Sequence, residues 1–400
     1  MIKVLFANTH YPDRYNLWAP WNKLANIAVS KSRAIEPEVI VPRAYTLPLK
    51  FFPQHETCGL PATERSVEGL VHYPRFLYLL PKKYFYAASF DLYSYFVGKY
   101  VRSHIGRKDL VHAHHVFLDG YGMVETCKKW RAPLIVDVHG DSVFTQMVRD
   151  PLIGRKMADT LKYSSKVVCI SRNLCQLAKS FGIDEDRIEY VPLGIDIGKY
   201  RPKEQDRIKC VRGLQDKIVI LYVGQLIERK GVKHLLKALA LVDPALLGKC
   251  RVAIVGDGPE RARLEWLAGK LGLDRHVTFT GKVPDADLLD WYAAADIFVL
   301  PSLSEGRPTV INEAMASECA VIASDVSGIP EQVTDGRNGF LVPPADPVAL
   351  AEKITYLLEN ENDIGAMGRN GRKKLVDEQI TWEGYADRMV KIYGSVTGCT

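Results

Sequence analysis

The sequence lacks the patterns that would place it in a membrane or brace it with cross-links. No run reaches about 18 apolar residues, so no transmembrane helix is expected. The eight cysteines are scattered and form no CxxC pair, which argues against a disulfide framework and predicts reduced thiols. The first residues turn polar too soon for a signal peptide. These absences predict a cytoplasmic protein.

The chain also has only a small excess of positive over negative charge. Lysine and arginine number 53 against 47 acidic residues, which leaves a net charge of only +6 in 400 residues. A nucleic-acid-binding protein usually carries a denser basic block, so no nucleic acid is expected as a partner. The apolar share of 47% is typical of a globular protein, and the length suggests two or three domains.

Several common catalytic motifs are missing. The chain has no GxxxxGK[ST], no GxSxG and no HExxH, which argues against a P-loop ATPase, an α/β-hydrolase and a zinc protease. Gly256-Asp257-Gly258 follows a predicted strand, but Arg261 stands where a dinucleotide fingerprint has its third glycine. We expect Pro259 to open a helix there instead.

Short β-rich runs alternate with longer amphipathic stretches. Many runs are continuous in valine and isoleucine, as in strands covered on both faces. Strands are predicted at 2–7, 38–41, 110–113, 133–138, 166–170, 187–191, 217–223, 251–255, 276–280, 297–300 and 320–323, and helices include 232–241, 259–271 and 348–358. The pattern predicts two α/β domains with parallel sheets and ligand sites at the carboxyl ends of the strands.

The domain boundary is expected within residues 190–202. Two prolines and two glycines punctuate this stretch, and a charged segment follows it. We therefore predict a first domain that ends at residue 195 and a second that begins at residue 196.

Residues 71–108 combine eleven aromatic and seven basic residues with one acid, Asp91. Aromatic rings beside cations suit the headgroup layer of an anionic membrane, so the segment predicts peripheral contact with the cytoplasmic membrane face. The alternative is an amphipathic helix that packs its rings into the first domain. Composition leaves both interpretations open.

A basic turn follows the predicted strand at 217–223. Arg229 and Lys230 stand side by side in it, near the strand end where α/β sheets usually bind ligands. Two adjacent cations there would attract a diphosphate through Coulomb energy and charge-assisted hydrogen bonds. The alternative is a solvated surface turn.

Two acids flank a second predicted helix start. Glu305 precedes Pro308, which we expect to begin a helix, and Glu313 falls in the second turn. The free amides of Thr309 and Val310, together with the helix dipole, form an anion site. The carboxylates would bind hydroxyls at two ends of one ligand. The alternative is two solvated acids, with Glu305 acting as a cap.

The E-x7-E spacing of Glu305 and Glu313 resembles the signature of retaining GT-B glycosyltransferases of glycosyltransferase family 4, also called group 1. The similarity is dense over 186–376 and sparser at 109–115 and 138–140. It implies the GT-B fold, in which two Rossmann-like domains face each other across a cleft. The first domain (1–195) would bind the acceptor and be completed by a C-terminal helix at 382–400, and the second (196–381) would bind a nucleotide sugar.

The resemblance also implies an activity. The chain would be a retaining, metal-independent glycosyltransferase, in particular a hexosyltransferase, that moves a sugar from a nucleotide-diphosphate sugar to a cell-surface polysaccharide or glycolipid acceptor. No cofactor or metal is expected beyond the donor substrate. Two alternatives are a GT-B sugar-nucleotide epimerase and a non-catalytic nucleotide-sugar-binding subunit.

Four residues are implied to be catalytic. Arg229 and Lys230 would neutralise the diphosphate, and Glu305 would hold hydroxyls of the donor sugar. His139 would reach that sugar from the first domain, although a histidine after a strand is often structural. The implied substrate-binding residues are Gln225, Val283, Gly306, Arg307, Pro308, Thr309, Val310 and Glu313. Among them, Glu313 would bind the ribose and the loop that contains Val283 would meet the base.

The chain departs from the family pattern in three places. Residues 9–16 lack the paired glycines that many members carry near the donor phosphates, and Gln225 stands where many members have arginine. Glu318-Cys319-Ala320 replaces a turn of small residues and proline. Phosphate neutralisation would therefore depend more heavily on Arg229 and Lys230.

Overall fold

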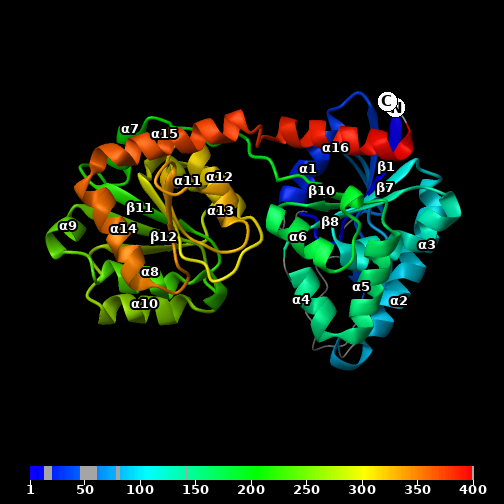
Figure 1. Cartoon of the computed structure of the whole chain (residues 1–400), viewed down its shortest axis with the longest axis horizontal. Coiled ribbons are helices and arrows are strands. Elements are labelled where there is room, and N and C mark those ends of the chain that lie inside the picture. The colour runs from blue at the N-terminus through cyan, green and yellow to red at the C-terminus, as the bar shows by residue number, and fades with distance from the viewer. Residues whose placement is uncertain (13–19, 46–60, 78–81, 141, 399–400) are drawn as a thin grey trace. The chain divides into compact units, whose positions relative to one another are not determined.

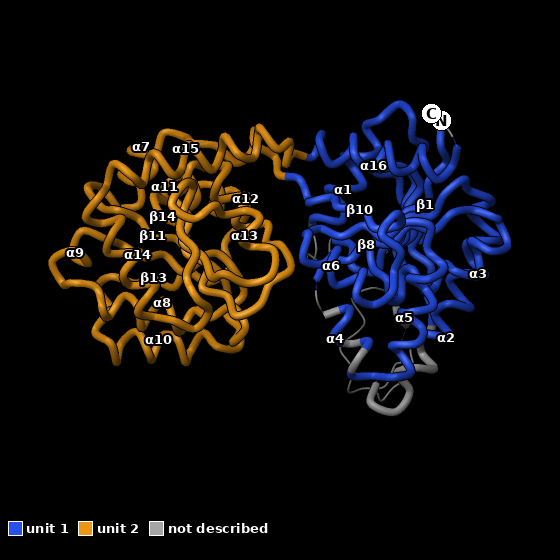
Figure 2. Tube along the Cα trace, in the orientation of Figure 1, with its two compact units in different colours: residues 1–194, 382–400 blue, residues 195–381 orange. Residues whose placement is uncertain are grey.

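The computed structural model describes residues 1–12, 20–45, 61–77, 82–140 and 142–398. The chain divides into two compact units, which Figure 2 shows in different colours. Unit 1 comprises Met1–Gly194 together with the C-terminal stretch from Trp382, and unit 2 comprises Ile195–Thr381. Each unit has a hydrophobic core of its own.

Unit 1 is built on an eight-stranded sheet. In spatial order its strands are β10 (Ile188–Tyr190), β9 (Lys166–Cys169), β8 (Leu134–Val138), β7 (Leu110–Ala113), β1 (Ile2–Ala7), β2 (Ile35–Ile40), β5 (Gly69–His72) and β4 (Thr63–Ser66). All neighbours are parallel except β4 and β5. Every residue of β7 and β8 is buried, because helices cover both faces of the central strands. A separate pair, β3 (Arg43–Tyr45) and β6 (Arg75–Leu77), is parallel.

Helices connect the parallel strands of unit 1. They are α1 (Pro20–Ser30), α2 (Lys82–Tyr100), α3 (Tyr121–Trp130), α4 (Ser142–Arg149), α5 (Pro151–Tyr163) and α6 (Arg172–Ser180), with π-helical turns η2 (Val101–Ile105) and η3 (Val116–Gly120). Local signals set two of the starts: Asp150 caps α5, and Ser171 caps α6 through the Leu174 amide. The last helix, α16 (Trp382–Thr397), returns to unit 1 and packs on α1 (Figure 1).

Unit 2 contains a six-stranded parallel sheet. Its order is β13 (Val277–Gly281), β12 (Cys250–Val255), β11 (Ile218–Val223), β14 (Ile297–Leu300), β15 (Ala320–Ser324) and β16 (Gly339–Val342). The strand order reverses between β11 and β14, and ligands of such sheets bind at the carboxyl ends beside this switch point. The segments that follow β11 and β14 carry the predicted basic turn and the predicted acids.

The helices of unit 2 follow the same alternation. They are α7 (Gln205–Val211), η5 (a 3₁₀ turn, Glu228–Lys230), α8 (Val232–Leu239), α9 (Pro244–Gly248), α10 (Arg261–Lys270), α11 (Asp285–Ala294), α12 (Thr309–Ala316), α13 (Ile329–Gln332), α14 (Pro347–Glu359) and α15 (Glu361–Asp377). Asp346 caps α14 through the amides of Val348 and Ala349.

The prediction of two α/β domains built on largely parallel sheets is confirmed, and three details of it are wrong. The edge strand β4 runs antiparallel to β5, because a tight connection of two residues joins them. Pro259 does not open a helix: α10 begins two residues later, at Arg261. Strands β3, β4, β5, β6 and β16 lie where the sequence analysis predicted no strand.

The aromatic stretch at 71–108 is divided between the core and the surface. Tyr73, Phe76, Phe90 and Tyr93 are buried in the core of unit 1, as the packing interpretation requires. Tyr95 and Phe96 of α2 are 59% and 39% exposed. Peripheral membrane contact through these exposed rings therefore stays a prediction. Residues 78–81 lie outside the described residues. No helix in the described ranges is long and apolar enough to cross a bilayer.

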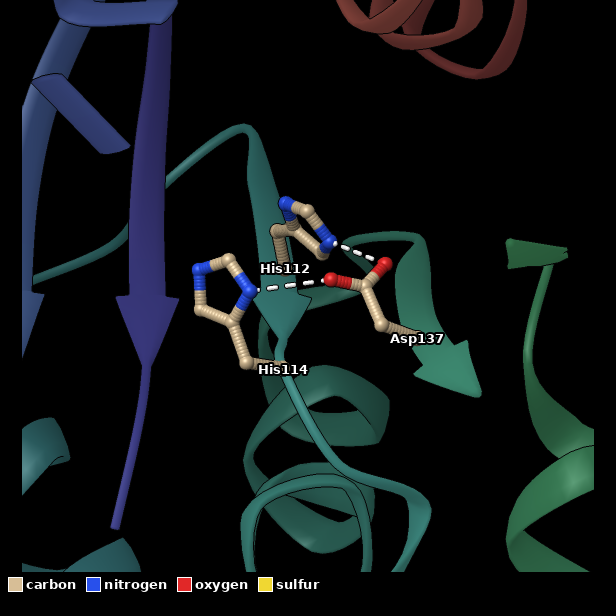
Figure 3. A group of neighbouring side chains, drawn as sticks. All are labelled: His112, His114 and Asp137. Carbon is tan, nitrogen blue, oxygen red and sulfur yellow. Dashed lines mark hydrogen bonds and ion pairs between the residues drawn. The ribbon is translucent and has the colours of Figure 1, made fainter. Parts of the chain in front are cut away.

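A buried carboxylate ties the sheet of unit 1 to two helices. Asp137 of β8 accepts hydrogen bonds from His112 Nε2 at 2.8 Å and His114 Nδ1 at 2.9 Å (Figure 3). The far nitrogen of His112 contacts the Tyr393 hydroxyl of α16 at 2.7 Å, and that of His114 contacts Asn26 of α1 at 2.6 Å. Burial favours the neutral acid, but the two imidazoles outweigh it and hold the pKa of Asp137 well below its usual range.

Tyr393→Phe tests this tie between α16 and the sheet. The change removes one hydroxyl and leaves Nδ1 of His112 buried without a partner, which should cost about 1–3 kcal/mol. The unfolding midpoint of unit 1 should fall by about 2–4 °C per kcal/mol, as measured by calorimetry. Tyr95→Phe, at an exposed position of α2, is the control. Equal midpoints for the two variants would show that the hydroxyl does not anchor α16.

Candidate functional site

The basic turn of unit 2 is held against the loop that precedes α12. Gly231, which follows Lys230, has a left-handed φ of 66°, and a Cβ there would lie 2.0 Å from the Pro301 carbonyl oxygen. The Leu303 amide donates to the Arg229 carbonyl at 2.8 Å. Glycine is therefore required at position 231 by both conformation and space. The backbone contacts fix both cations beside the loop.

Glu305 is the centre of this group. Its side chain is 6% exposed, and its Oε1 accepts from Lys230 Nζ at 2.6 Å and from the Ser302 hydroxyl at 2.7 Å. Arg229 Nη1 lies 3.6 Å from the other carboxylate oxygen and donates to the Ser304 carbonyl at 2.8 Å. The structure thus brings together three of the four residues predicted to be catalytic. It also contradicts the alternative in which Glu305 is a solvated acid.

The start of α12 adds positive potential beside this cluster. The helix begins at Thr309, directly after Pro308, and has no side-chain cap, so Glu305 does not act as one. The first amides of a helix have no partner within it, and its dipole favours an anion. Thr309 and Val310 are half-buried there. Two cations and a helix terminus facing one carboxylate leave a net attraction for negative charge.

The loop before α12 is braced from behind. The Gly328 amide donates to the Gly306 carbonyl at 2.9 Å. The Gln332 side-chain amide of α13 donates to the Pro308 carbonyl at 3.0 Å and to Asn312 Oδ1 at 2.7 Å. These bonds hold the loop and the first turn of α12 in one arrangement. Glu305 in the loop and the free amides at the helix start are therefore preorganised. Arg307, in the same loop, is 6% exposed.

Glu313 has a different environment from Glu305. Its Oε2 accepts the hydroxyl proton of Tyr292 at 2.7 Å. Burial raises the pKa of Glu313 to about 6, and the Tyr292 hydrogen bond and the charge of Lys199 oppose that rise. One acid of the E-x7-E pair is therefore held by cations and the other by a neutral hydroxyl. The two carboxyls therefore differ in their environment, and we expect them to make different contacts with a ligand.

The glycines of the rejected dinucleotide motif serve backbone packing. A Cβ at Gly256 would lie 1.9 Å from the Gly224 carbonyl oxygen, and one at Gly258 would lie 2.4 Å from that of Leu226. Gln225 stands in the turn that these contacts hold, and its carbonyl accepts the hydroxyl of Tyr222 at 3.0 Å. The motif therefore joins the ends of β11 and β12.

Val283 follows β13 at the neighbouring strand end. Its side chain is half-buried and packs against the core of unit 2. The Gly256 amide donates to the Gly281 carbonyl at 2.9 Å, which links this loop to the turn after β12. The predicted base-binding loop thus lies at the same edge of the sheet as the turn that carries Gln225.

His139 belongs to unit 1, at the end of β8. Its side chain is 14% exposed, and neither ring nitrogen has a hydrogen-bond partner among the described residues. Nε2 lies 3.7 Å from Asp137 Oδ2. Burial lowers the pKa of His139 to about 3, so the ring is neutral at physiological pH. A neutral imidazole offers one donor and one acceptor to a ligand.

Metal-binding capacity within the described ranges is confined to His112, His114 and Asp137, whose ligand atoms lie within 4.8 Å of one another. The hydrogen bonds in Figure 3 already engage both carboxylate oxygens. The far ring nitrogens contact Tyr393 and Asn26. The group therefore acts as a structural hydrogen-bond network in this fold.

Sequence reasoning missed several residues that support the site. Ser302 is three residues before Glu305, and this spacing was the only available signal for their contact. Tyr292 and Gln332 come from separate helices and could be found only in three dimensions. In unit 1, the pairing of His115 with Asp119 was also missed, although an i,i+4 spacing links them.

Two family models match the chain in succession. The model described as Glycosyltransferase Family 4 matches residues 33–199, and the model described as Glycosyl transferases group 1 matches residues 204–374. The first match includes His139. The second includes every predicted site residue of unit 2.

Relatives and solved structures agree with these matches. D-inositol 3-phosphate glycosyltransferase 2 of Catenulispora acidiphila is 32% identical over 311 residues, which cover 72% of this chain and 71% of the relative. TuaC of Bacillus subtilis, named as a teichuronic acid biosynthesis glycosyltransferase, is 31% identical over 62% of this chain and 60% of its own. The structure of Anabaena HepE in complex with UDP has a TM-score of 0.76 at 20% identity and covers 99% of this chain and 100% of that one.

The sequence relatives establish the family, and the structural likeness establishes the fold. Two Rossmann-like units, the E-x7-E acids and the two consecutive family matches all point the same way. The chain belongs to the group 1 glycosyltransferases of family 4 and is a glycosyltransferase of the GT-B fold.

Proposed function

We propose that the chain transfers a hexose from a nucleotide-diphosphate sugar to a hydroxyl of a cell-surface polysaccharide or glycolipid, with retention of configuration and without a metal ion. The observation that carries this proposal is the contact of Lys230 and Arg229 with Glu305 beside the start of α12. The UDP bound to HepE supports a uridine diphosphate donor. The name of TuaC supports a polysaccharide product.

The cations act on the leaving group. As the bond between C1 and the phosphate oxygen breaks, the sugar gains oxocarbenium character and charge accumulates on the diphosphate. Arg229, Lys230 and the amides of α12 bind that charge more strongly in the transition state than in the ground state, which lowers the barrier. Lys230 carries three N–H donors, so it binds a phosphate oxygen while it keeps its bond to Glu305.

Glu305 of unit 2 and His139 of unit 1 each offer contacts to sugar hydroxyls. The buried carboxylate of Glu305 is fixed by its two bonds at Oε1, and it accepts hydrogen bonds from sugar hydroxyls through Oε2. His139 binds a further hydroxyl through its unpartnered nitrogens. The acceptor oxygen attacks C1 on the side that the phosphate leaves. The acceptor proton passes to the departing phosphate, which gives retention without a protein nucleophile.

The remaining predicted roles concern the nucleotide. In this proposal Glu313 binds ribose hydroxyls, and Val283 and Gln225 border the base. Arg307, Gly306 and Pro308 shape the loop at the diphosphate. The braced loop and the close-packed turns after β11 and β12 support these roles, because both present fixed backbone to a ligand.

Glu305→Gln, Lys230→Ala and Arg229→Ala test the transfer site. Each variant should lower the rate of UDP release from UDP-glucose by about 100-fold or more, in line with the loss of one preorganised charge contact. Lys249→Ala is the matched control, because Lys249 is exposed and pairs with Glu361 away from the basic turn. Wild-type turnover should survive EDTA.

The outcomes separate the candidate functions. Full activity in all three variants would overturn the proposal, and loss of activity in EDTA would overturn the metal-independent route. An epimerised nucleotide sugar formed without an acceptor would favour the epimerase instead. UDP binding without turnover across a broad acceptor panel would favour a non-catalytic subunit. UDP binding is measured by the rise in unfolding temperature, since a ligand of the folded state stabilises it.

Glu313→Gln tests the second acid through pH. The folded-state pKa of about 6 lies above the ordinary value of 4.5, so the folded protein binds this proton more tightly than the unfolded chain does. Glu313 therefore reduces the stability as pH rises from about 4.5 through 6, by an amount on the order of 1 kcal/mol. The variant should gain stability relative to wild type at pH 7.5 but not at pH 4. The exposed Glu359→Gln should show no such difference, and a pH-independent effect of Glu313→Gln would contradict the assignment.

We also propose that α2 contacts an anionic membrane surface. Tyr95 and Phe96 are exposed next to the exposed Lys99. Vesicles containing phosphatidylglycerol should sediment the wild-type protein at low salt and release it at high salt, because screening weakens the attraction. Tyr95→Gln/Phe96→Gln should reduce sedimentation, and Trp266→Gln, at an exposed position of unit 2, should not. Failure of the wild type to sediment would exclude this contact.

A further inference from the structure

Three neighbouring strands of unit 1 are each followed by a histidine at their carboxyl ends. His10 follows β1, His115 follows β7 and His139 follows β8. The ring centroids of His10 and His115 are 4.7 Å apart, and those of His115 and His139 are 5.3 Å apart. The three rings form a row, which we call the imidazole row, at the sheet edge where α/β folds bind ligands.

A buried acid holds the central ring. Asp119 is 0% exposed, and its Oδ2 lies 3.0 Å from His115 Nδ1. Its Oδ1 accepts the Thr9 amide at 2.8 Å. The preceding residue, Leu118, has a positive φ of 65°, which is unusual for leucine. The turn η3 thus bears conformational strain and places a carboxylate beneath the imidazole row.

The partners of Asp119 determine the tautomer of His115. The Thr9 amide is a donor only, so Oδ1 is occupied as an acceptor. Above the pKa of about 7 to which burial raises Asp119, the ionised Oδ2 then requires Nδ1 of His115 to carry the ring proton. Nε2 is left with its lone pair, on a side chain that is 26% exposed. His115 therefore offers a hydrogen-bond acceptor to a ligand.

The charge of the three imidazoles determines which kind of ligand the imidazole row can bind. Burial lowers the pKa of His115 to about 4 and that of His139 to about 3, and it also lowers the pKa of His10. Neutral imidazoles match hydroxyl groups, which both donate and accept, better than they match phosphate, which needs donors or cations. The row is suited to a sugar or a cyclitol.

We propose that His115 accepts a hydrogen bond from a hydroxyl of a sugar or cyclitol acceptor other than the one that attacks, and that Asp119 is the positioning residue that presents Nε2 for it. This assignment rests on the proposed transferase function. The contact with His115 fixes how the acceptor lies in unit 1. The proton of the attacking hydroxyl is not shared with His115 and passes to the departing phosphate, so every bond and charge of the transfer is accounted for as above.

The first test reads the ring directly. The full chain is labelled with ¹⁵N-histidine and studied at pH 8, above the pKa of about 7 to which burial raises Asp119. The His115 signals, identified by their loss in His115→Gln, should show the proton on Nδ1. Methyl α-glucoside or myo-inositol should shift the Nε2 signal, and inorganic phosphate at the same concentration should not. A proton on Nε2, an unmoved Nε2 signal, or a response to phosphate alone would overturn the assignment.

A matched pair of variants separates positioning from packing. His115→Asn retains an atom near Nδ1 for Asp119 but has none near Nε2, whereas His115→Gln places its amide near Nε2. Polyol affinity, followed on the His139 ring, should fall about tenfold in His115→Asn, as expected for one lost hydrogen bond, and recover in part in His115→Gln. Asp119→Asn should move the ring proton toward Nε2. Equal polyol affinity in wild type and His115→Asn would refute the role of His115.

A separate measurement distinguishes a failure of the His115 role from a failure of the proposed transferase function. UDP should raise the unfolding temperature of the wild type and of both His115 variants equally, because its predicted contacts lie in unit 2. Absence of that rise in the wild type would count against the donor site. The polyol response would still decide the role of His115.

Discussion

The proposed donor site of unit 2 depends on a largely buried ion pair between Lys230 and Glu305. Glu305 is held by Lys230 and Ser302 at one oxygen and approached by Arg229 at the other. A buried carboxylate without partners would be strongly unfavourable, so the basic turn and the loop before α12 stabilise each other. The same contact fixes the cations where negative charge would collect during transfer. The same ion pair therefore stabilises the loop and holds the cations in position for the proposed reaction.

Unit 1 uses buried carboxylates in two different ways. Asp137 receives two imidazole donors, and its pKa is depressed. Asp119 receives a backbone amide and one imidazole, yet burial raises its pKa to about 7. The first arrangement holds elements together, while the second leaves one ring nitrogen of His115 available. The two acids differ in the kind of donor and not in a shortage of donors, because two imidazoles face Asp137 and only one faces Asp119.

Much of the fold could be predicted from periodicity. Continuous valine and isoleucine runs located the central strands of both sheets, because such strands are covered on both faces. Pro259 was misleading, since the turn that contains it is held by the packing of Gly258 against Leu226. Strands β4, β5 and β6 were missed because each has only three or four residues, and β4 and β6 are paired on one side only.

The site was predictable where its residues are close in sequence. Arg229, Lys230 and Glu305 were found from turn and helix signals together with family resemblance, and the structure brings them into contact. Tyr292 and Gln332 were not found, because each reaches the site from a helix distant in the chain. His115 and Asp119 were overlooked because their proposed role depends on burial, which cannot be read from a sequence.

The return of α16 to unit 1 has a consequence for the order of events during synthesis. Unit 2 is a single uninterrupted segment, whereas unit 1 needs residues from both sides of it. As the chain emerges from the ribosome, unit 2 has all its strands before the Tyr393 hydroxyl exists to meet His112. Unit 1, whose first strands are synthesised earliest, is therefore the last of the two units to be completed.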